Sequence, residues 1–214
     1  MIGTKASAID AWAADHGQAM LRLDYGGYGE SEGDFETQSL DDRLSDILLV
    51  IDAAVEGPLV LIGSSMGGWL MLLAALARLE RVVGLVGIAP APDFTEWGFD
   101  ADERAQFARD GRIDHPSDLG GTYPTMKIFW DSGQANLLLG AAEGEGGIAF
   151  DGPVRLIHGD ADETVPWQIS IRLMAGLGSA DVQTTLVKGG DHRLQRPGDI
   201  AAILRVTGDL LESL

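Results

Sequence analysis

The chain of 214 residues contains no cysteine, which excludes disulfide bonds and thiolate chemistry. Basic residues are also scarce: 15 Lys and Arg stand against 33 Asp and Glu, so the formal net charge is −18. Such an acidic chain argues against nucleic acid and anionic lipid as partners. No apolar run approaches the roughly 20 residues that a membrane-spanning helix needs, and residues 1–18 contain no apolar signal-peptide core. We therefore expect no membrane span and, by default, a cytoplasmic location.

What is present predicts a folded α/β protein. Apolar residues make up 45% of the chain, and we expect one domain, or one domain with an inserted cap. Apolar periodicity predicts helices over residues 4–16, 40–55, 69–79, 167–177 and 200–211. Short apolar and β-branched runs predict strands over residues 19–23, 58–62, 82–88, 154–157 and 182–187. This alternation is typical of a mainly parallel, doubly wound sheet with helices on both faces.

The interval from residue 94 to residue 150 interrupts the alternation. It has no clear strand pattern, and a structureless loop of that length is unusual in a compact domain. We therefore expect residues 94–150 to form a helical cap inserted into a core of residues 1–93 and 151–214. The rings of the interval either line an apolar pocket or pack the cap; they are Phe94, Trp97, Phe99, Phe107, Tyr123, Phe129 and Trp130.

A sharp turn follows the predicted strand 58–62. The sequence there is Gly63-Ser64-Ser65-Met66-Gly67, a Gly-x-Ser-x-Gly motif between a strand and an apolar helix. In that context the motif predicts a nucleophile elbow, in which small residues allow strand and helix to approach closely. The turn would expose the hydroxyl of Ser65 and direct the amide of Met66 at a developing oxyanion. Ser64 has no such glycine spacing, and we interpret it as structural.

A serine nucleophile needs a base, and the base needs an orienting acid. In a parallel sheet these groups gather beyond the carboxyl ends of the strands. His192 follows the predicted strand 182–187, and the acid candidates Asp160, Asp162 and Glu163 follow the predicted strand 154–157. The order serine, acid, histidine is the one expected for this architecture. Chain order does not separate the three acids.

The other histidines are weaker candidates for the base. His16 ends the first predicted helix, and His115 lies inside the expected cap beside a proline. His158 directly ends a strand, and we expect it to hydrogen-bond the following loop rather than to abstract a proton. Asp191 precedes His192 and is expected to cap or orient its loop. Neither a His-Glu-x-x-His motif nor a close cluster of ligands predicts a metal site, and the mechanism needs no cofactor.

Several stretches resemble the α/β-hydrolase superfamily and, within it, the branch of palmitoyl-protein thioesterases that also cleave acyl glucuronides. They are Gly3-Thr4-Lys5-Ala6, Arg22-Leu23-Asp24-Tyr25, Gly57-Pro58, Gly63-Ser64-Ser65-Met66-Gly67-Gly68-Trp69-Leu70-Met71, His158-Gly159 with Asp162, Val165-Pro166-Trp167 and Asp191-His192-Arg193. The resemblance implies Ser65 as nucleophile, His192 as base and Asp162 as its partner, acting on an ester or thioester through an acyl-enzyme. It does not extend clearly to the cap.

The chain departs from the family at its start. In the family a central strand and a glycine-containing loop precede the segment that resembles Gly3–Ala6, and the loop supplies a second oxyanion donor. We therefore expect an N-terminally shortened fold that lacks the usual first strands, or direct pairing of strands 19–23 and 58–62. Loss of one oxyanion donor costs roughly 2.7–4 kcal/mol of transition-state stabilisation.

The sequence as a whole predicts a serine hydrolase whose partner is a small-molecule acyl ester or thioester. One alternative is an acyltransferase that uses the same three residues. A second is a binding protein whose catalysis is impaired because the oxyanion loop is missing. Neither the natural substrate nor the oligomeric state is indicated by the sequence.

Overall fold

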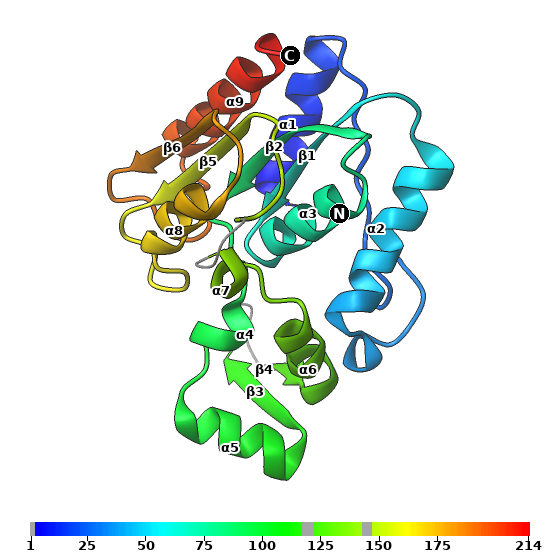
Figure 1. Ribbon diagram of the computed structural model, residues 1–214, viewed down its shortest axis with the longest axis vertical. Helices are drawn as coiled ribbons and strands as arrows, with labels where there is room; N and C mark the ends of the chain where they lie inside the picture. The colour runs from blue at the N-terminus through cyan, green and yellow to red at the C-terminus, as the bar shows by residue number, and fades with distance from the viewer. Residues whose placement is uncertain (1–2, 117–121, 143–146) are drawn as a thin grey trace. The chain divides into compact units, whose positions relative to one another are not determined.

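The computed structural model describes residues 3–116, 122–142 and 147–214 (Figure 1). Its contacts divide the chain into two compact units. The first, here called the sheet unit, comprises Met1–Leu23, Glu56–Pro92 and Leu138–Leu214. The second, here called the hairpin unit, comprises Asp24–Val55 and Asp93–Leu137. These boundaries differ from the expected core and cap, because Asp24–Val55 joins the second unit and the end of the expected cap, from Leu138, joins the first.

The sheet unit contains four parallel strands in the order β1-β2-β5-β6. They are β1 (Leu59–Ser64), β2 (Val82–Ile88), β5 (Val154–Gly159) and β6 (Val182–Val187). All four lie where apolar runs predict them, and β2 and β6 have the predicted bounds. Since the strands are parallel, their carboxyl ends meet at one edge of the sheet, and the loops after them lie together there.

Helices cover both faces of this sheet (Figure 1). On one face lie α1 (Thr4–Asp15) and α9 (Pro197–Glu212), while α3 (Met66–Ala77) and α8 (Gln168–Gly176) lie on the other. The short α7 (Leu139–Ala142) contacts α8. The core under α1 and α9 joins residues of the central strands to the helices: Ile9, Val86, Ile88, Ile157, Leu194, Ala202, Ile203, Val206 and Leu210. The predicted doubly wound α/β architecture is therefore confirmed.

The predicted strand at residues 19–23 does not form, and the segment is irregular. Its apolar alternation indicates a strand, but a strand exists only through ladder hydrogen bonds to a neighbour. Within the described residues β1 pairs only with β2, so residues 19–23 have no ladder partner. Met20 instead packs against the core under α1 and α9. Direct pairing of residues 19–23 with residues 58–62, one of the two alternatives that the sequence left open, is therefore not found between these described segments.

The hairpin unit contains strands that the sequence did not predict. Its elements are η1 (Phe35–Thr37), α2 (Leu40–Ala54), α4 (Phe94–Trp97), α5 (Ala101–Asp110), β3 (Arg112–Pro116), β4 (Thr122–Met126) and α6 (Lys127–Ala135). Antiparallel pairing joins β3 to β4, with Ile113 opposite Thr125 and His115 opposite Tyr123. Both strands contain proline and mix polar with apolar residues, so they lack a recognisable period-2 pattern. Residues 117–121 and 143–146 of the expected cap lie outside the described residues.

The aromatic side chains of the hairpin unit mostly form its own core. Phe99, Phe107 and Ile113 are buried together, and Phe94 and Trp130 pack against them. The Trp130 indole N–H donates to the carbonyl of Thr95 at 3.0 Å. Of the two uses that the sequence left open for these rings, the structure shows packing of the unit's own core.

Arg43 explains why α2 belongs to the same unit. Its side chain is 2% exposed, and its guanidinium carbon lies 4.7 Å from the centre of the Phe129 ring on α6. The same guanidinium donates from Nη1 to the carbonyls of Gln38 and Ser39, at 2.9 and 3.1 Å.

No helix in the described ranges is both long and apolar enough to cross a membrane.

Candidate active site

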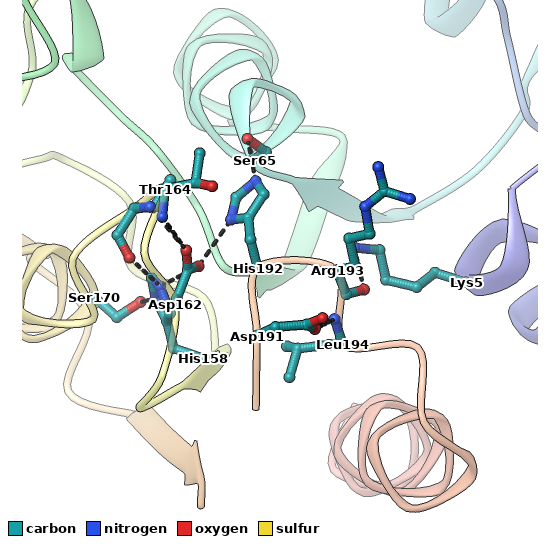
Figure 2. A network of polar contacts seen from close by, with 11 residues as sticks. Lys5, Ser65, His158, Asp162, Thr164, Ser170, Asp191, His192, Arg193 and Leu194 are labelled. Atoms are coloured by element: carbon teal, nitrogen blue, oxygen red, sulfur yellow. Dashed lines mark hydrogen bonds and ion pairs between the residues drawn. The ribbon is translucent and has the colours of Figure 1, made fainter. Parts of the chain in front are cut away.

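Three loops at the carboxyl edge of the sheet bring together side chains from distant parts of the chain (Figure 2). Ser65 follows β1, Asp162 follows β5 and His192 follows β6. All three belong to the sheet unit. The positions that the sequence singled out therefore meet in one place.

Ser65 occupies a strained turn between β1 and α3. Its backbone has φ 55° and ψ −125°, a conformation that side chains rarely adopt. The turn is held from both sides: the Ser65 amide donates to the carbonyl of Ile88 at 3.0 Å, and the Ser65 carbonyl accepts from Gly68 and Ala91. Strain maintained by surrounding bonds is typical of functional positions. The next residue, Met66, is the first of α3, so its N–H lies at the positive end of the helix.

The approach of β1 to α3 requires glycine at the first motif position. A Cβ on Gly63 would overlap the carbonyl oxygen of Gly67 and come within 2.8 Å of the Gly68 Cα. Both contacts are with backbone, which cannot move aside as a side chain can. The steric reason given for the motif therefore applies directly to Gly63.

His192 connects the serine to the acid. Its Nε2 lies 3.1 Å from the Ser65 Oγ, and its Nδ1 lies 2.8 Å from the Asp162 Oδ2. The Nδ1–H of His192 donates a hydrogen bond to the carboxylate, so the lone pair of Nε2 faces the hydroxyl. The imidazole is 24% exposed, while the Asp162 side chain is fully buried. This geometry allows Nε2 to take the Ser65 proton while Asp162 stabilises the resulting imidazolium.

The Asp162 carboxylate accepts four hydrogen bonds. Oδ1 accepts from the amides of Thr164 and Val165, both at 2.8 Å. Oδ2 accepts from His192 and also from the Nε2 of His158, at 3.1 Å. Burial alone raises the pKa of this carboxyl group, but the bonds from His158, His192 and Val165 outweigh it, and the pKa lies well below its ordinary value. Asp162 therefore remains ionised across the physiological range.

The neighbouring acids have other roles or positions. Asp160 accepts from the Lys188 Nζ at 2.7 Å and from the Gly189 amide at 2.6 Å, so it ties the Asp162 loop to the segment after β6. Glu163 is exposed. Of the three acids that chain order left open, Asp162 is the one that the structure places against His192.

Close backbone packing holds the acid loop and the histidine loop together. The amide of Ala161 donates to the carbonyl of Gly190 at 3.0 Å. A Cβ on Gly159 would overlap that same carbonyl, so only glycine permits the approach. The distance between Asp162 and His192 is therefore set by main chain as well as by side chains.

The turn that carries His192 has its own supports. Asp191 Oδ1 accepts from the amide of Leu194 at 2.8 Å, and Leu194 is fully buried with φ 46°. Lys5 on α1 donates from Nζ to the carbonyl of Arg193 at 2.8 Å. Burial lowers the pKa of Lys5, and the charges of Asp191 and Asp162 partly oppose that shift. The sequence predicted the capping role of Asp191 but not the contact of Lys5.

The remaining histidines contact other groups. His16 stacks on Trp12 with ring centres 4.2 Å apart, and His115 stacks on Tyr123 in the hairpin unit. His158 hydrogen-bonds the loop that follows β5, as the sequence predicted, but its particular partner there, Asp162, was not predicted. In the part of the chain that the structure describes, no group of three His, Cys, Asp or Glu side chains is placed to hold a metal ion.

Comparison with known proteins identifies similar sequences and structures. A family model described as serine aminopeptidase, S33, matches residues 4–102. Human palmitoyl-protein thioesterase ABHD10, mitochondrial, is 36% identical over 219 residues, which cover all of this chain and 70% of that protein. The expected cytoplasmic location is not confirmed, because the name of this relative places it in mitochondria.

Two solved structures share both fold and sequence with this chain. Mouse alpha/beta hydrolase domain-containing protein 10 has a TM-score of 0.90 and 35% identity, covering 100% of this chain and 85% of that one. A putative hydrolase from Agrobacterium vitis S4 has a TM-score of 0.89 and 35% identity, covering 97% and 82%.

The lowered pKa of Asp162 predicts a specific dependence of stability on pH. In the unfolded chain this carboxyl group protonates near its ordinary pKa of about 4, whereas in the folded protein it remains ionised to lower pH. Its contribution to stability is therefore complete above the unfolded pKa and is lost as pH falls toward the folded pKa. We expect Asp162→Asn to destabilise the protein most at pH 6 and progressively less below pH 4. Urea unfolding of both proteins from pH 6 to pH 3 measures this, and an equal difference throughout would contradict it.

Proposed function

Since the chain belongs to the α/β-hydrolase superfamily, in the branch that includes ABHD10, we propose that it is a serine hydrolase that cleaves a carboxylic ester or thioester through an acyl-enzyme. The observation that carries this proposal is the continuous line of hydrogen bonds from Asp162 through His192 to Ser65. A hydroxyl is a weak nucleophile unless an oriented base accepts its proton, and this line provides that base.

The proposed reaction begins when Ser65 Oγ attacks the acyl carbonyl and His192 Nε2 takes the hydroxyl proton. His192 then gives this proton to the departing alcohol or thiol as the tetrahedral intermediate collapses. Water enters and His192 removes its proton as the water oxygen attacks the acyl carbon. His192 then returns that proton to the Ser65 Oγ as the second tetrahedral intermediate collapses and the acid is released. The buried charge of Asp162 stabilises the imidazolium in both steps.

Met66 supplies the oxyanion donor in this proposal. Its N–H opens α3, and the first N–H groups of a helix have no acceptor within the helix. Because Ser65 and Met66 are consecutive, attack by the hydroxyl brings the carbonyl oxygen of the substrate toward this amide. A preorganised donor stabilises the developing charge without reorganisation during the reaction.

The substrate class follows from the relatives. The name of ABHD10 describes a palmitoyl-protein thioesterase, and 36% identity across the whole chain supports the same bond type here. A thioester and an ester place similar demands on Ser65, so we propose both as substrates.

Reaction with a fluorophosphonate tests the nucleophile. We expect the probe to label the native protein at Ser65, and Ser65→Ala to abolish labelling, because phosphonylation needs the activated hydroxyl. Ser64→Ala is the matched control and should label normally, since Ser64 belongs to β1 and lies opposite Ile88 in the sheet. Peptide mass spectrometry locates the adduct, and persistent labelling of Ser65→Ala at another residue would refute the assignment.

Substitution of the neighbouring acids tests the role of Asp162. In Asp162→Asn the side-chain NH2 would face His192 and favour the tautomer with hydrogen on Nε2, which cannot accept the Ser65 proton. We expect kcat for a short p-nitrophenyl ester to fall by about 10⁴-fold, as in other enzymes of this type. The control Asp160→Asn loses only the contacts to Lys188 and Gly189 and should retain most activity. A larger loss in Asp160→Asn would reverse the assignment.

A further inference from the structure

His158 is a fully buried histidine that the proposed reaction does not use. It is the penultimate residue of β5, four residues before Asp162, and its side chain is 0% exposed. Burying an imidazole costs free energy unless both ring nitrogens form hydrogen bonds. Its contacts therefore indicate what it is for.

The two ring nitrogens of His158 face different kinds of partner. Nε2 lies 3.1 Å from the Asp162 Oδ2 and 3.0 Å from the carbonyl oxygen of Val165. Both of these are acceptors, so Nε2 carries a hydrogen and donates it. Nδ1 lies 2.7 Å from the Oγ of Ser170, a fully buried hydroxyl on α8 that can donate to it. Figure 2 shows Ser170, His158, Asp162, His192 and Ser65 in that order.

We propose that His158 is a positioning residue for the hydrolytic reaction, which holds Asp162 Oδ2 in place so that His192 stays aligned with Ser65. The two backbone amides on Oδ1 hold only one carboxylate oxygen. His158 holds the other, which His192 also contacts, and connects it to β5 and, through Ser170, to α8. Oδ1 is then held by main-chain amides of its own loop, and Oδ2 is connected through His158 to β5 and α8.

This role has a kinetic consequence distinct from stability. Without the His158 N–H, Oδ2 has only the His192 ring to position it, and that ring is on a loop and partly exposed. A small displacement of a catalytic group slows reaction steeply because the reacting atoms lose alignment. A merely structural histidine would change the amount of folded protein but not the rate at each intact site. His158 does not contact Ser65 directly, so we expect its substitution to lower kcat rather than to raise KM.

A pair of amide substitutions separates these cases. In His158→Gln the side-chain NH2 reaches approximately the position of Nε2 and can donate to Asp162 and Val165. In His158→Asn it reaches only the position of Nδ1, near Ser170. Both variants are polar and uncharged, so they differ mainly in the bond to Asp162. His16→Asn is the matched control, because His16 contacts Trp12 on α1.

Two quantities are measured for each protein. The first is the rate at which a fluorophosphonate inactivates it, normalised to the concentration of active sites found by titration. The second is kcat and KM for a p-nitrophenyl ester. The inference rests on the proposed function, so labelling of the native protein at Ser65 is established first. We expect His158→Asn to lower the rate per site and kcat by about 10- to 100-fold, by analogy with the loss when a residue that orients a metal-ligating side chain is replaced. His158→Gln and His16→Asn should remain close to the native protein, with KM little changed in all three.

The results distinguish the two failures. If the native protein labels at Ser65 but His158→Asn reacts at the native rate per site, the positioning role is refuted and the proposed function stands. Equal losses in His158→Asn and His158→Gln would also refute it, since the bond to Asp162 would not be the cause. If the native protein does not label, the proposed function fails and the inference fails with it.

Discussion

The buried carboxylate of Asp162 is the group on which the rest of the site depends. An isolated carboxylate in this position would be strongly disfavoured, and it is tolerated because four donors satisfy it. Those donors lower its pKa, so it keeps the charge that an imidazolium at His192 needs. The same bonds fix its orientation. Burial, charge and alignment are therefore consequences of one set of hydrogen bonds.

The parallel sheet determines where this set can be assembled. Ser65, Asp162 and His192 follow three different strands whose carboxyl ends share one edge. The loops are then drawn together by main-chain contacts, including the bond from Ala161 to Gly190. On the serine side, glycine at position 63 allows β1 to pass directly into α3 and leaves the Met66 amide at the start of that helix. Strand order and small residues therefore determine where the three side chains meet.

Much of this arrangement could be predicted from the sequence, for local reasons. The bounds of β2 and β6 follow from apolar and β-branched runs, and the elbow follows from glycine spacing between a strand and a helix. Chain order placed an acid and a histidine after later strands, although Asp162 was preferred to Asp160 only with the help of a family resemblance. Those predictions needed no tertiary information.

What was missed depends on partners far away in the chain. Residues 19–23 have the pattern of a strand but no neighbour to pair with, and β3 and β4 pair despite proline and polar residues. Joining α2 to the hairpin unit depends on Arg43 packing on Phe129, which no local pattern reveals. The contact of Lys5 with the carbonyl of Arg193 is likewise tertiary. For His158 the bond to the following loop was predicted, but not its partner Asp162.

The most direct test of the role of Asp162 is a 1H–15N correlation spectrum that assigns the tautomers of the four histidine rings. We expect opposite neutral tautomers, with hydrogen on Nδ1 of His192 and on Nε2 of His158, because both nitrogens face the same carboxylate oxygen. A neutral His192 with its hydrogen on Nε2, or the same tautomer in both rings, would contradict it.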